Sequence, residues 1–524
     1  MRVAIRRDIG RRPGLAVGVR LLLPILLSLG VGCASLPPAP ERAPSTAFDQ
    51  PESTAVGAAV GEAAAGRPGW SGFSLLRTGR EALSARVFLT EMAERSLDLQ
   101  YYIFKGDTAG SVMAERLLRA ADRGVRVRLL LDDNNLAGHD PIAAALDAHP
   151  NVEVRIFNPF AHRESHGFDF AIDFGRVNHR AHNKIFVADG AVAILGGRNI
   201  GDDYFGLSAE ANFRDLDVAA VGPVVGEIAA GFDGYWNSDW AYPVAALVER
   251  QAAPADLERL RTGVRAKLDA HPCPYPLDGG ATDLRAWLGG LVAGLVWAQA
   301  RVVADEPGEL TRGRRGEVAA ALVEQMAAAE REILVESAYF VHRKAGVEAA
   351  RRVCEAGVRV RVLTNSLASN DVMLAHAGYE KHRKGLLKAG VELHELRPDA
   401  RTVSEQVAPE AAGAITSLHT KVVVLDRESV FIGSFNLDLR SAELNTEVAL
   451  LISSPELAVA VAAFMDEGAA PASSFRVVLG DDGDLVWIAE DEDGERRWTH
   501  EPETGGWARF SADLVRLLPI QSQL

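Results

Sequence analysis

A short set of polar residues occurs twice in the chain with the same internal spacing. The first copy consists of His182, Lys184, Asp189, Gly196 and Asn199, and the second of His419, Lys421, Asp426, Gly433 and Asn436. One run of this kind could arise by chance, whereas two copies far apart in the chain indicate duplication. We therefore expect two similar halves, each supplying one half of a single site.

The repeat extends to the segments that precede the motif. Three stretches of the second half match three of the first in the same order: 333–340 with 97–104, 357–361 with 124–128, and 390–393 with 151–154. Their offsets are 236, 233 and 239, and the two motif histidines are 237 residues apart. Helical patterns alternate with these apolar runs near 86–95, 109–123 and 142–148. This alternation predicts an α/β fold, with helices on the faces of a mixed or parallel sheet and the halves packed as a pseudo-twofold pair.

The length of the chain agrees with two domains, because single cores stop growing near ~250–300 residues and this chain has 524. We predict a leader over 1–33, a flexible linker over 34–66, a first domain over 67–245, an insert over 246–310, a second domain over 311–472, and a C-terminal hairpin and helix over 473–524. Within the insert, residues 284–303 are strongly apolar and could face a membrane. We favour a buried helix and strand that bridge the domains, since large apolar surface patches are uncommon.

Charge and hydropathy exclude two classes of protein. The net charge of -15 opposes nucleic-acid binding, which requires many Lys and Arg contacts to phosphates, so no nucleic-acid partner is expected. A mean hydropathy of +0.01 excludes a protein with many membrane-spanning segments.

The N-terminus has the order of a bacterial export signal, with arginines, then the apolar run 21–29, then small residues before Cys33. This arrangement resembles a lipoprotein cleavage box, and we predict that Cys33 becomes a lipid-modified N-terminus. An ordinary secretory signal and an uncleaved anchor are the alternatives, although 21–32 is shorter than the ~20 apolar residues of a spanning helix. The protein is then exported and anchored facing the periplasm, at the inner or the outer membrane.

The motif residues suit chemistry at a phosphodiester. Residues i and i+2 of a strand share one face, so His182 and Lys184 form one pair and His419 and Lys421 another. No metal site is expected, because a Lys charge repels a cation beside His. Lysines with Asn199 and Asn436 can hold nonbridging phosphate oxygens, while one imidazole attacks phosphorus and the other transfers protons.

The carboxylates near the motif have separate predicted roles. Asp189 precedes a glycine between two apolar runs, and Asp426 begins a polar turn, so both should shape turns. Glu447 is the candidate to orient His419, and Asp215 or Asp217 occupies the matching position in the first half. The alternative for these three is a solvated surface position.

The two runs match the signature H-x-K-x4-D-x6-G-S-x-N, present in two copies in the phospholipase D superfamily, which the chain resembles. The second copy is complete with Ser434, whereas the first has Gly197 at that place. We expect the Ser434 hydroxyl to join the site, so that the first half holds the phosphate with one donor fewer. Four further segments resemble bacterial cardiolipin synthases, and most closely their third, C type: 196–205, 337–341, 364–371 and 433–438.

The resemblance implies two duplicated phospholipase D-like α/β/α sandwich domains, and membrane phospholipids as partners. It implies transfer of a phosphatidyl group to phosphatidylglycerol to form cardiolipin, with phosphatidylethanolamine associated with the third type as donor, and with no cofactor. It also implies a phosphohistidine on His182 and general acid/base catalysis by His419, although the sequence alone leaves open which histidine has which role. Alternatives are a hydrolytic phospholipase D, a nuclease or phosphodiesterase, and a non-catalytic lipid-binding lipoprotein.

Overall fold

The computed structural model describes residues 36–38, 40–163, 166–308, 316–400, 406–491 and 494–505. Cys33 and the helix expected near 510–520 lie outside these residues. By its internal contacts the chain divides into Met1–Pro38 and Ala39–Leu524.

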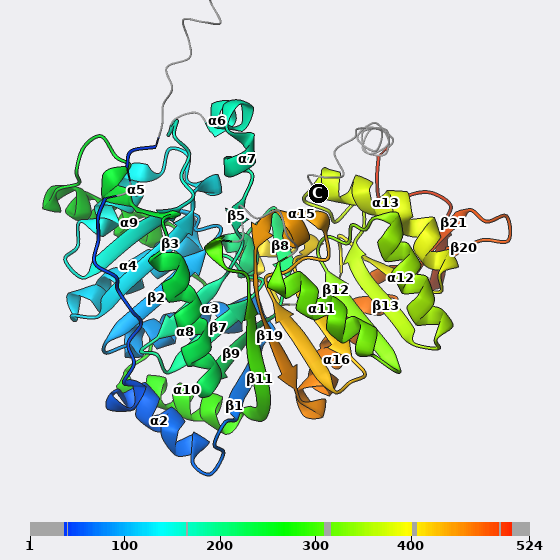
Figure 1. The fold of residues 1–524 in the computed structure, drawn as a ribbon, viewed down its shortest axis with the longest axis horizontal. Coiled ribbons are helices and arrows are strands. Elements are labelled where there is room, and N and C mark those ends of the chain that lie inside the picture. Colours follow the sequence, from blue (N-terminus) through cyan, green and yellow to red (C-terminus); the bar gives the residue numbers. More distant parts are fainter. Residues whose placement is uncertain are drawn as a thin grey trace, which may run out of the picture. The chain divides into compact units, whose positions relative to one another are not determined.

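The first half contains a mixed sheet with a parallel centre (Figure 1). Its strands, in spatial order, are β10 (Ala241–Pro243), β4 (Val152–Phe157), β3 (Arg126–Asp132), β2 (Ser96–Tyr101), β6 (Ile185–Ala188), β7 (Val192–Gly196), β9 (Asp217–Val221) and β1 (Ser71–Leu76). β2, β3 and β4 run parallel, and the remaining neighbours in this order are antiparallel. The central strands are rich in Val, Ile and Leu because helices cover them on both faces.

The second half repeats this order. Its strands, in the order that matches β4 to β9, are β14 (Glu392–Leu396), β13 (Arg359–Asn365), β12 (Glu332–Ser337), β16 (Lys421–Leu425), β17 (Ser429–Gly433) and β19 (Val448–Ser453). Leu97 lies opposite Ala188 where β2 meets β6, and Ile333 lies opposite Leu425 where β12 meets β16. Ile333 is 236 positions after Leu97 and Leu425 is 237 positions after Ala188, which are the offsets found in the sequence for the first matching stretch and for the two histidines. The duplication inferred from the motif is confirmed at the level of strand register.

One strand of the insert joins the two sheets. β11 (Val296–Ala304) pairs antiparallel with β1 on one side and with β19 on the other. The helix α10 (Ala281–Ala293) precedes it. The expected bridging strand is therefore confirmed, whereas the expected buried helix is not, because Leu288 is the only buried residue of α10. One apolar core contains residues of both halves, among them Val187, Val218, Val424 and Leu450.

Helices cover the faces of both sheets (Figure 1). In the first half they are α3 (Gly79–Met92), α4 (Thr108–Asp122), α5 (Asp140–Asp147) and α8 (Pro223–Trp236), with α9 (Pro254–Ala270) from the insert. In the second half they are α11 (Glu317–Ala328), α12 (Lys344–Glu355), α13 (Met373–Lys388) and α16 (Pro455–Ala469). The start of α3 is set by a capping box, in which Thr78 accepts from the Glu81 amide and Glu81 accepts from the Thr78 amide.

Shorter elements complete the unit. They are η1 (Pro51–Ser53), η2 (Asp133–Asn135), α6 (His166–Ile172), α7 (Phe174–Val177), β5 (Arg180–Ala181), η3 (Asp202–Tyr204), β8 (Ala211–Arg214), η4 (Val244–Ala246), η6 (Pro409–Ala411), β15 (Ile415–Leu418), α15 (Leu439–Glu443) and β18 (Asn445–Thr446). The expected C-terminal hairpin is confirmed as β20 (Ser474–Leu479) and β21 (Leu485–Asp491), and β22 (Gly494–Trp498) adds a third strand beyond it. Within the described residues, no helix combines the length and apolar character needed to span a bilayer.

The predicted flexible linker over 34–66 was wrong for its second part. Helix α2 (Ala55–Ala64) lies there, and Val56 and Val60 are buried in the apolar core of the first half. These two valines are four positions apart, so they share one face of a helix whose other positions are mostly Ala and Gly. Upstream of η1, the Ser45 carbonyl accepts a hydrogen bond of 2.8 Å from buried Arg128.

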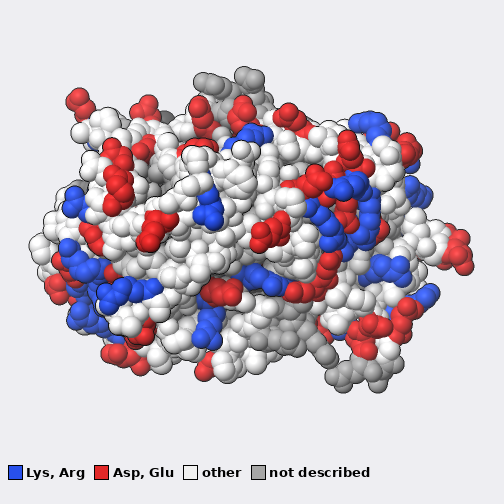
Figure 2. All heavy atoms as spheres, turned by 90° about the horizontal axis from the view of Figure 1, so that it is seen from below, with Lys and Arg blue, Asp and Glu red and all other residues white. Residues whose placement is uncertain are grey.

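The surface carries charges of both signs. On the face shown in Figure 2, acidic and basic side chains lie side by side among uncharged residues.

Candidate active site

The two motif histidines are held by strands that cross between the halves. β5 pairs in parallel with β18 of the second half, and β15 pairs in parallel with β8 of the first. His182 follows β5 and donates its backbone N–H to the Thr446 carbonyl at 2.9 Å, while His419 follows β15 and donates to the Arg214 carbonyl at 2.8 Å. The main chain of the opposite half therefore positions each imidazole.

The same crossing decides which carboxylate meets which imidazole. Nδ1 of His182 lies 3.0 Å from Oε2 of Glu447, and Nδ1 of His419 lies 2.7 Å from Oδ2 of Asp215. The expected pairing of Glu447 with His419 was wrong, because Glu447 follows β18 and so lies beside the residue that follows β5. All four side chains are buried, so the alternative of solvated surface positions for Glu447 and Asp215 is excluded.

Asp217 is not the orienting residue of either histidine. Its carboxylate instead accepts a 2.9 Å hydrogen bond from buried Arg86. Of the two candidates that the sequence left open, Asp215 is therefore the one at the site.

Both motif lysines are buried, with 1% of each exposed, and lie beside the imidazoles. Lys184 Nζ donates to the His182 carbonyl, and Lys421 Nζ donates to the His419 carbonyl. Burial lowers the pKa of Lys184 well below its usual value and that of Lys421 to about 8, while Glu447 and Asp215 raise both. Nearby carboxylates thus partly offset the burial of two ammonium groups.

The charges of the lysines of both halves lower the pKa of each imidazole, so the four groups lie in one site. Burial lowers the pKa of His182 well below its usual range, and Lys184 and Lys421 lower it further. The pKa of His419 is lowered by burial, then by Lys421, Lys184 and His182. Both imidazoles are therefore neutral near pH 7 before substrate binds. Burial raises the pKa of Glu447 to about 7 and also raises that of Asp215.

Both motif asparagines, Asn199 and Asn436, are buried. Asn199 accepts a 3.1 Å hydrogen bond from the Ile103 amide through Oδ1, which fixes its side chain. Asn436 Oδ1 has no hydrogen-bond partner among the described residues.

Asp189 and Asp426 lie in the hairpin turns and hold them against the sheet. Each has a positive φ, 52° and 54°. The carboxylate of Asp189 accepts from the amides of residues 94–96, and that of Asp426 accepts from the amides of residues 330–332. These carboxylates satisfy backbone donors at the start of β2 and β12, in keeping with the structural role expected from sequence.

Ser434 does not add a phosphate donor, contrary to expectation. Its hydroxyl donates to Glu447 Oε2 and accepts from the Val448 amide at 3.0 Å. The matching Gly197 is required by the other carboxylate, since a Cβ there would lie 2.3 Å from Oδ1 of Asp215. The difference between the two copies therefore concerns how each carboxylate is held.

Aromatic residues that the sequence analysis missed form walls beside the imidazoles. The ring of Tyr102 lies 5.1 Å from that of His182, and the ring of Tyr204 lies 5.1 Å from that of His419. The Tyr102 hydroxyl accepts from Asn134 at 2.8 Å. In the second half, Tyr339 donates to Asp371. Tyr339 and Asp371 stand 237 positions after Tyr102 and Asn134, so extending the repeat would have revealed both pairs.

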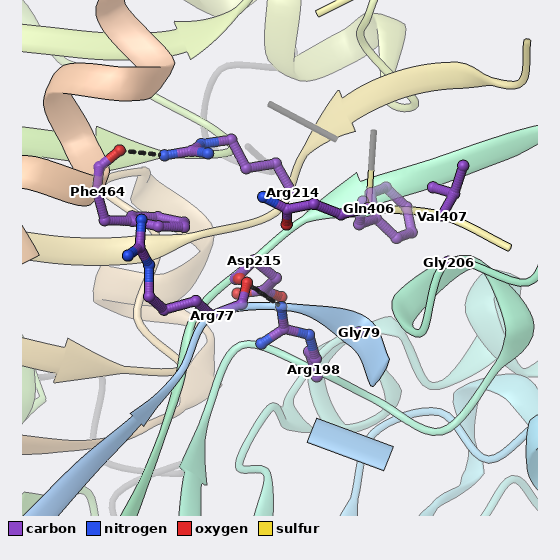
Figure 3. Close-up of a pocket in the computed structure, with 10 residues that line it drawn as sticks. Arg77, Gly79, Arg198, Gly206, Arg214, Asp215, Gln406, Val407 and Phe464 are labelled. Carbon is purple, nitrogen blue, oxygen red and sulfur yellow. Dashed lines mark hydrogen bonds between the residues drawn. The ribbon is translucent and has the colours of Figure 1, made fainter. Parts of the chain in front are cut away.

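A small cavity of about 20 Å³ lies behind Asp215 (Figure 3). Arg77, Arg198 and Arg214 line it, and Arg198 donates to the Asp215 carbonyl. The volume admits about one water molecule and no substrate. Of these arginines, Arg198 supports Asp215, because its positive charge favours the ionised form of the carboxylate.

The arrangement is suited to transfer of a phosphoryl-linked group. Two imidazoles can act as nucleophile and as acid or base, and two ammonium groups can stabilise negative charge on nonbridging oxygens. Among the described residues, no three His, Cys, Asp or Glu side chains gather as ligands for a metal ion.

Comparison with known proteins gives a consistent result. Residues 89–236 and 322–467 each match the family described as "Cardiolipin synthase, PLD-like domain". The chain is 39% identical to cardiolipin synthase C of Escherichia coli K12 over 463 residues, which cover 87% of this chain and 96% of that protein. It is 29% identical to cardiolipin synthase A of Pseudomonas syringae pv. syringae over 72% of this chain and 64% of that protein.

A solved structure supports the fold. The crystal structure of phosphatidylserine synthase from Haemophilus influenzae Rd KW20 matches 89% of this chain and all of that chain, with a TM-score of 0.53 and 14% identity.

Proposed function

Because the chain belongs to the family of cardiolipin synthases with phospholipase D-like domains, we propose that it forms cardiolipin from phosphatidylglycerol and a second phospholipid by phosphatidyl transfer. The observation that carries this proposal is the pairing of each motif histidine with a carboxylate of the other half. Two oriented imidazoles on one phosphodiester are what a double displacement requires.

In the first step, Nε2 of His182 attacks phosphorus, and the bond from phosphorus to the donor's headgroup oxygen breaks. His419 gives its proton to that oxygen, which leaves as a free alcohol. Glu447 holds the proton on Nδ1 of His182, so that Nε2 carries the lone pair. The negative phosphodiester raises the pKa of His419 on binding, since an opposite charge favours the imidazolium that acts as acid.

In the second step, a hydroxyl of phosphatidylglycerol attacks the phosphohistidine. His419 takes the hydroxyl proton, the bond to Nε2 of His182 breaks, and cardiolipin is released. Lys184, Lys421 and the two motif asparagines hold the nonbridging oxygens while charge builds on them.

The direct test incubates the purified protein with labelled phosphatidylglycerol, with and without phosphatidylethanolamine and without added divalent metal. We expect labelled cardiolipin. Phosphatidic acid as the sole lipid product would indicate a hydrolase instead of a synthase, and cleavage of oligonucleotides without lipid products would contradict both.

Which of the two imidazoles is the nucleophile is tested by quenching the reaction without acid and detecting a phosphoenzyme. His182→Ala should abolish the adduct, whereas His419→Ala should still form it from a substrate with a good leaving group. An adduct that survives His182→Ala and is lost in His419→Ala would reverse the assignment.

We also propose that the chain is exported and anchored to the membrane through a lipid on Cys33, facing the periplasm. The support is the apolar run and small residues before this cysteine. Cys33→Ser should move the protein from the membrane to the soluble fraction and prevent labelling with a fatty-acid probe. Unchanged labelling of the Cys33→Ser protein would contradict a lipid at this position.

A further inference from the structure

A cavity of about 350 Å³ lies in the first half, between β3, α4, α5 and α9. Its wall is mostly apolar and includes Leu129, Leu131, Leu136, Leu146, Leu260 and Val264. Three cationic side chains, Lys105, Arg259 and Lys267, stand among the remaining lining residues. This volume lies within the range of about 300–1,000 Å³ that is usual for small-molecule sites. We call it the α9 cavity.

The α9 cavity belongs to the first half only. Its outer wall is α9, which comes from the insert that the duplication lacks. In the second half, α12 and α13 occupy the places of α4 and α5 and pack against each other, and no described helix corresponds to α9. The insert thus builds a feature that the two-copy catalytic framework does not need.

The cationic side of the cavity lies close to the imidazoles. The Lys105 ammonium is 5.9 Å from the centre of the Tyr204 ring, and that ring is 5.1 Å from the His419 ring. Phe104, which also lines the cavity, forms a parallel bridge with Ile200, the residue after Asn199. Lys105, at one end of the cavity, and His419 are therefore both neighbours of the Tyr204 ring.

We propose that the α9 cavity binds an acyl chain of the phospholipid whose phosphate reacts at His182 and His419. An apolar cavity of this size takes up apolar groups without losing hydrogen bonds. Lys105, Arg259 and Lys267 already have partners in Asp203, Asp256 and the Gly106 carbonyl, so the apolar lining, and not the charge, indicates the acyl chain as the occupant. The proposal rests on the proposed function for the identity of the lipid. A free fatty acid has the same chain chemistry, and the test separates the two sources.

The cavity can be filled without disturbing the fold. A Cβ added to Gly263 of α9 meets no atom within 4 Å, so Gly263→Phe places a ring in the space without a backbone clash. Replacing a helical glycine also removes a helix-destabilising residue. Gly289→Phe is the matched control, because Gly289 lies in exposed α10, also has no atom within 4 Å of an added Cβ, and does not line the cavity.

Occupancy is measured without turnover, by photolabelling with phosphatidylglycerol that carries a diazirine at the end of one acyl chain. We expect adducts on the peptides of α9 and α4, a loss of at least about tenfold in Gly263→Phe, and no loss in Gly289→Phe, since each displaced methylene weakens binding about fourfold. Adducts elsewhere, or equal labelling of Gly263→Phe, would overturn the proposal. Equal labelling by a diazirine fatty acid would overturn the assignment to the phospholipid.

Kinetics give a second measurement. For long-chain phosphatidylglycerol, Gly263→Phe should raise KM at least about tenfold relative to Gly289→Phe. For a dihexanoyl lipid the two variants should agree, because a short chain does not fill the cavity. An equal effect of Gly263→Phe on both substrates would contradict chain binding. Labelling of α9 in a protein that makes only phosphatidic acid would support the cavity while refuting the synthase proposal, so the two failures are distinguishable.

Discussion

At the scale of single residues, the main feature is that each motif imidazole contacts a carboxylate from the other half. Glu447 meets His182 and Asp215 meets His419. A carboxylate on Nδ1 directs the lone pair to Nε2 and stabilises the imidazolium. Each half therefore lacks the carboxylate that orients its own histidine and receives it from the other half.

The crossed pairing predicts different defects for the two carboxylate substitutions. With a nitrophenyl phosphodiester, the leaving group needs no proton. Glu447→Gln should slow the burst of nitrophenol by about 10²–10⁴, because His182 loses its tautomer control. Asp215→Asn should keep the burst and lose mainly the transfer to an alcohol. Stopped-flow absorbance measures both.

The matched control is Glu258→Gln, at an exposed position on α9. A burst lost in Asp215→Asn and kept in Glu447→Gln would contradict either the pairing or the assignment of His182 as nucleophile.

The titration of Glu447 and Lys421 predicts a bell-shaped pH profile for the same reaction. Burial raises the pKa of Glu447 to about 7, so its carboxylate, and with it kcat/KM, is lost as pH falls through 7. Burial lowers the pKa of Lys421 to about 8, so its ammonium is lost as pH rises through 8. Lys421→Arg should remove the alkaline limb only, since a guanidinium stays protonated. An alkaline limb that persists in Lys421→Arg would assign it to another group.

At the scale of elements, sequence reasoning succeeded for long strands and failed for short ones. The central strands are continuous apolar runs, and the stretch 151–154 singled out in the sequence includes the first three residues of β4. β5 and β18 have two residues each, too few for any periodic pattern. The crossed pairing depends on such strands, so the sequence could propose the site residues but not the partners of the imidazoles.

The crossing strand β8 is held by a buried ion pair that can be tested. Arg214 donates to Glu336 at 2.9 Å, and both side chains are almost fully buried. Arg214→Met should lower the free energy of unfolding by about 3–5 kcal/mol, because it leaves a buried carboxylate unpaired. Arg214→Met with Glu336→Gln should recover part of this loss. Urea unfolding measures each value.

The loss should also depend on pH. Burial already raises the pKa of Glu336, and removal of Arg214 raises it further. A folded-state pKa above the unfolded one gives stability that is lost as pH rises, so Arg214→Met should be more destabilising at pH 8 than at pH 5. A double variant no more stable than Arg214→Met at either pH would show that the ion pair does not hold β8.

At the scale of the whole molecule, the two predicted domains form one continuous sheet. Its strands run from β10 to β22 through β11, and residues of both halves share a core. The duplication was visible in sequence because it repeats a spacing, whereas β11 lies in the insert and has no counterpart. β11 pairs with a strand on each side because each folded half has a free sheet edge there, and such edges cannot be recognised in the sequence of the insert.

The N-terminal segment provides the last test at this scale, because it was predicted as a linker and is part of the first half. Val56 and Val60 enter the core, and buried Arg128 donates to the Ser45 carbonyl. A chain that begins at Gly66 should lose at least about 3 kcal/mol of unfolding free energy, from two buried valines at ~1.5–3 kcal/mol each. A chain that begins at Pro40 keeps every contact named here and is the control. Urea unfolding of both forms decides between the two descriptions: equal stability would mean that residues 40–65 act only as a tether, whereas the expected loss would make them part of the fold that carries β1 and, through β9, Asp215.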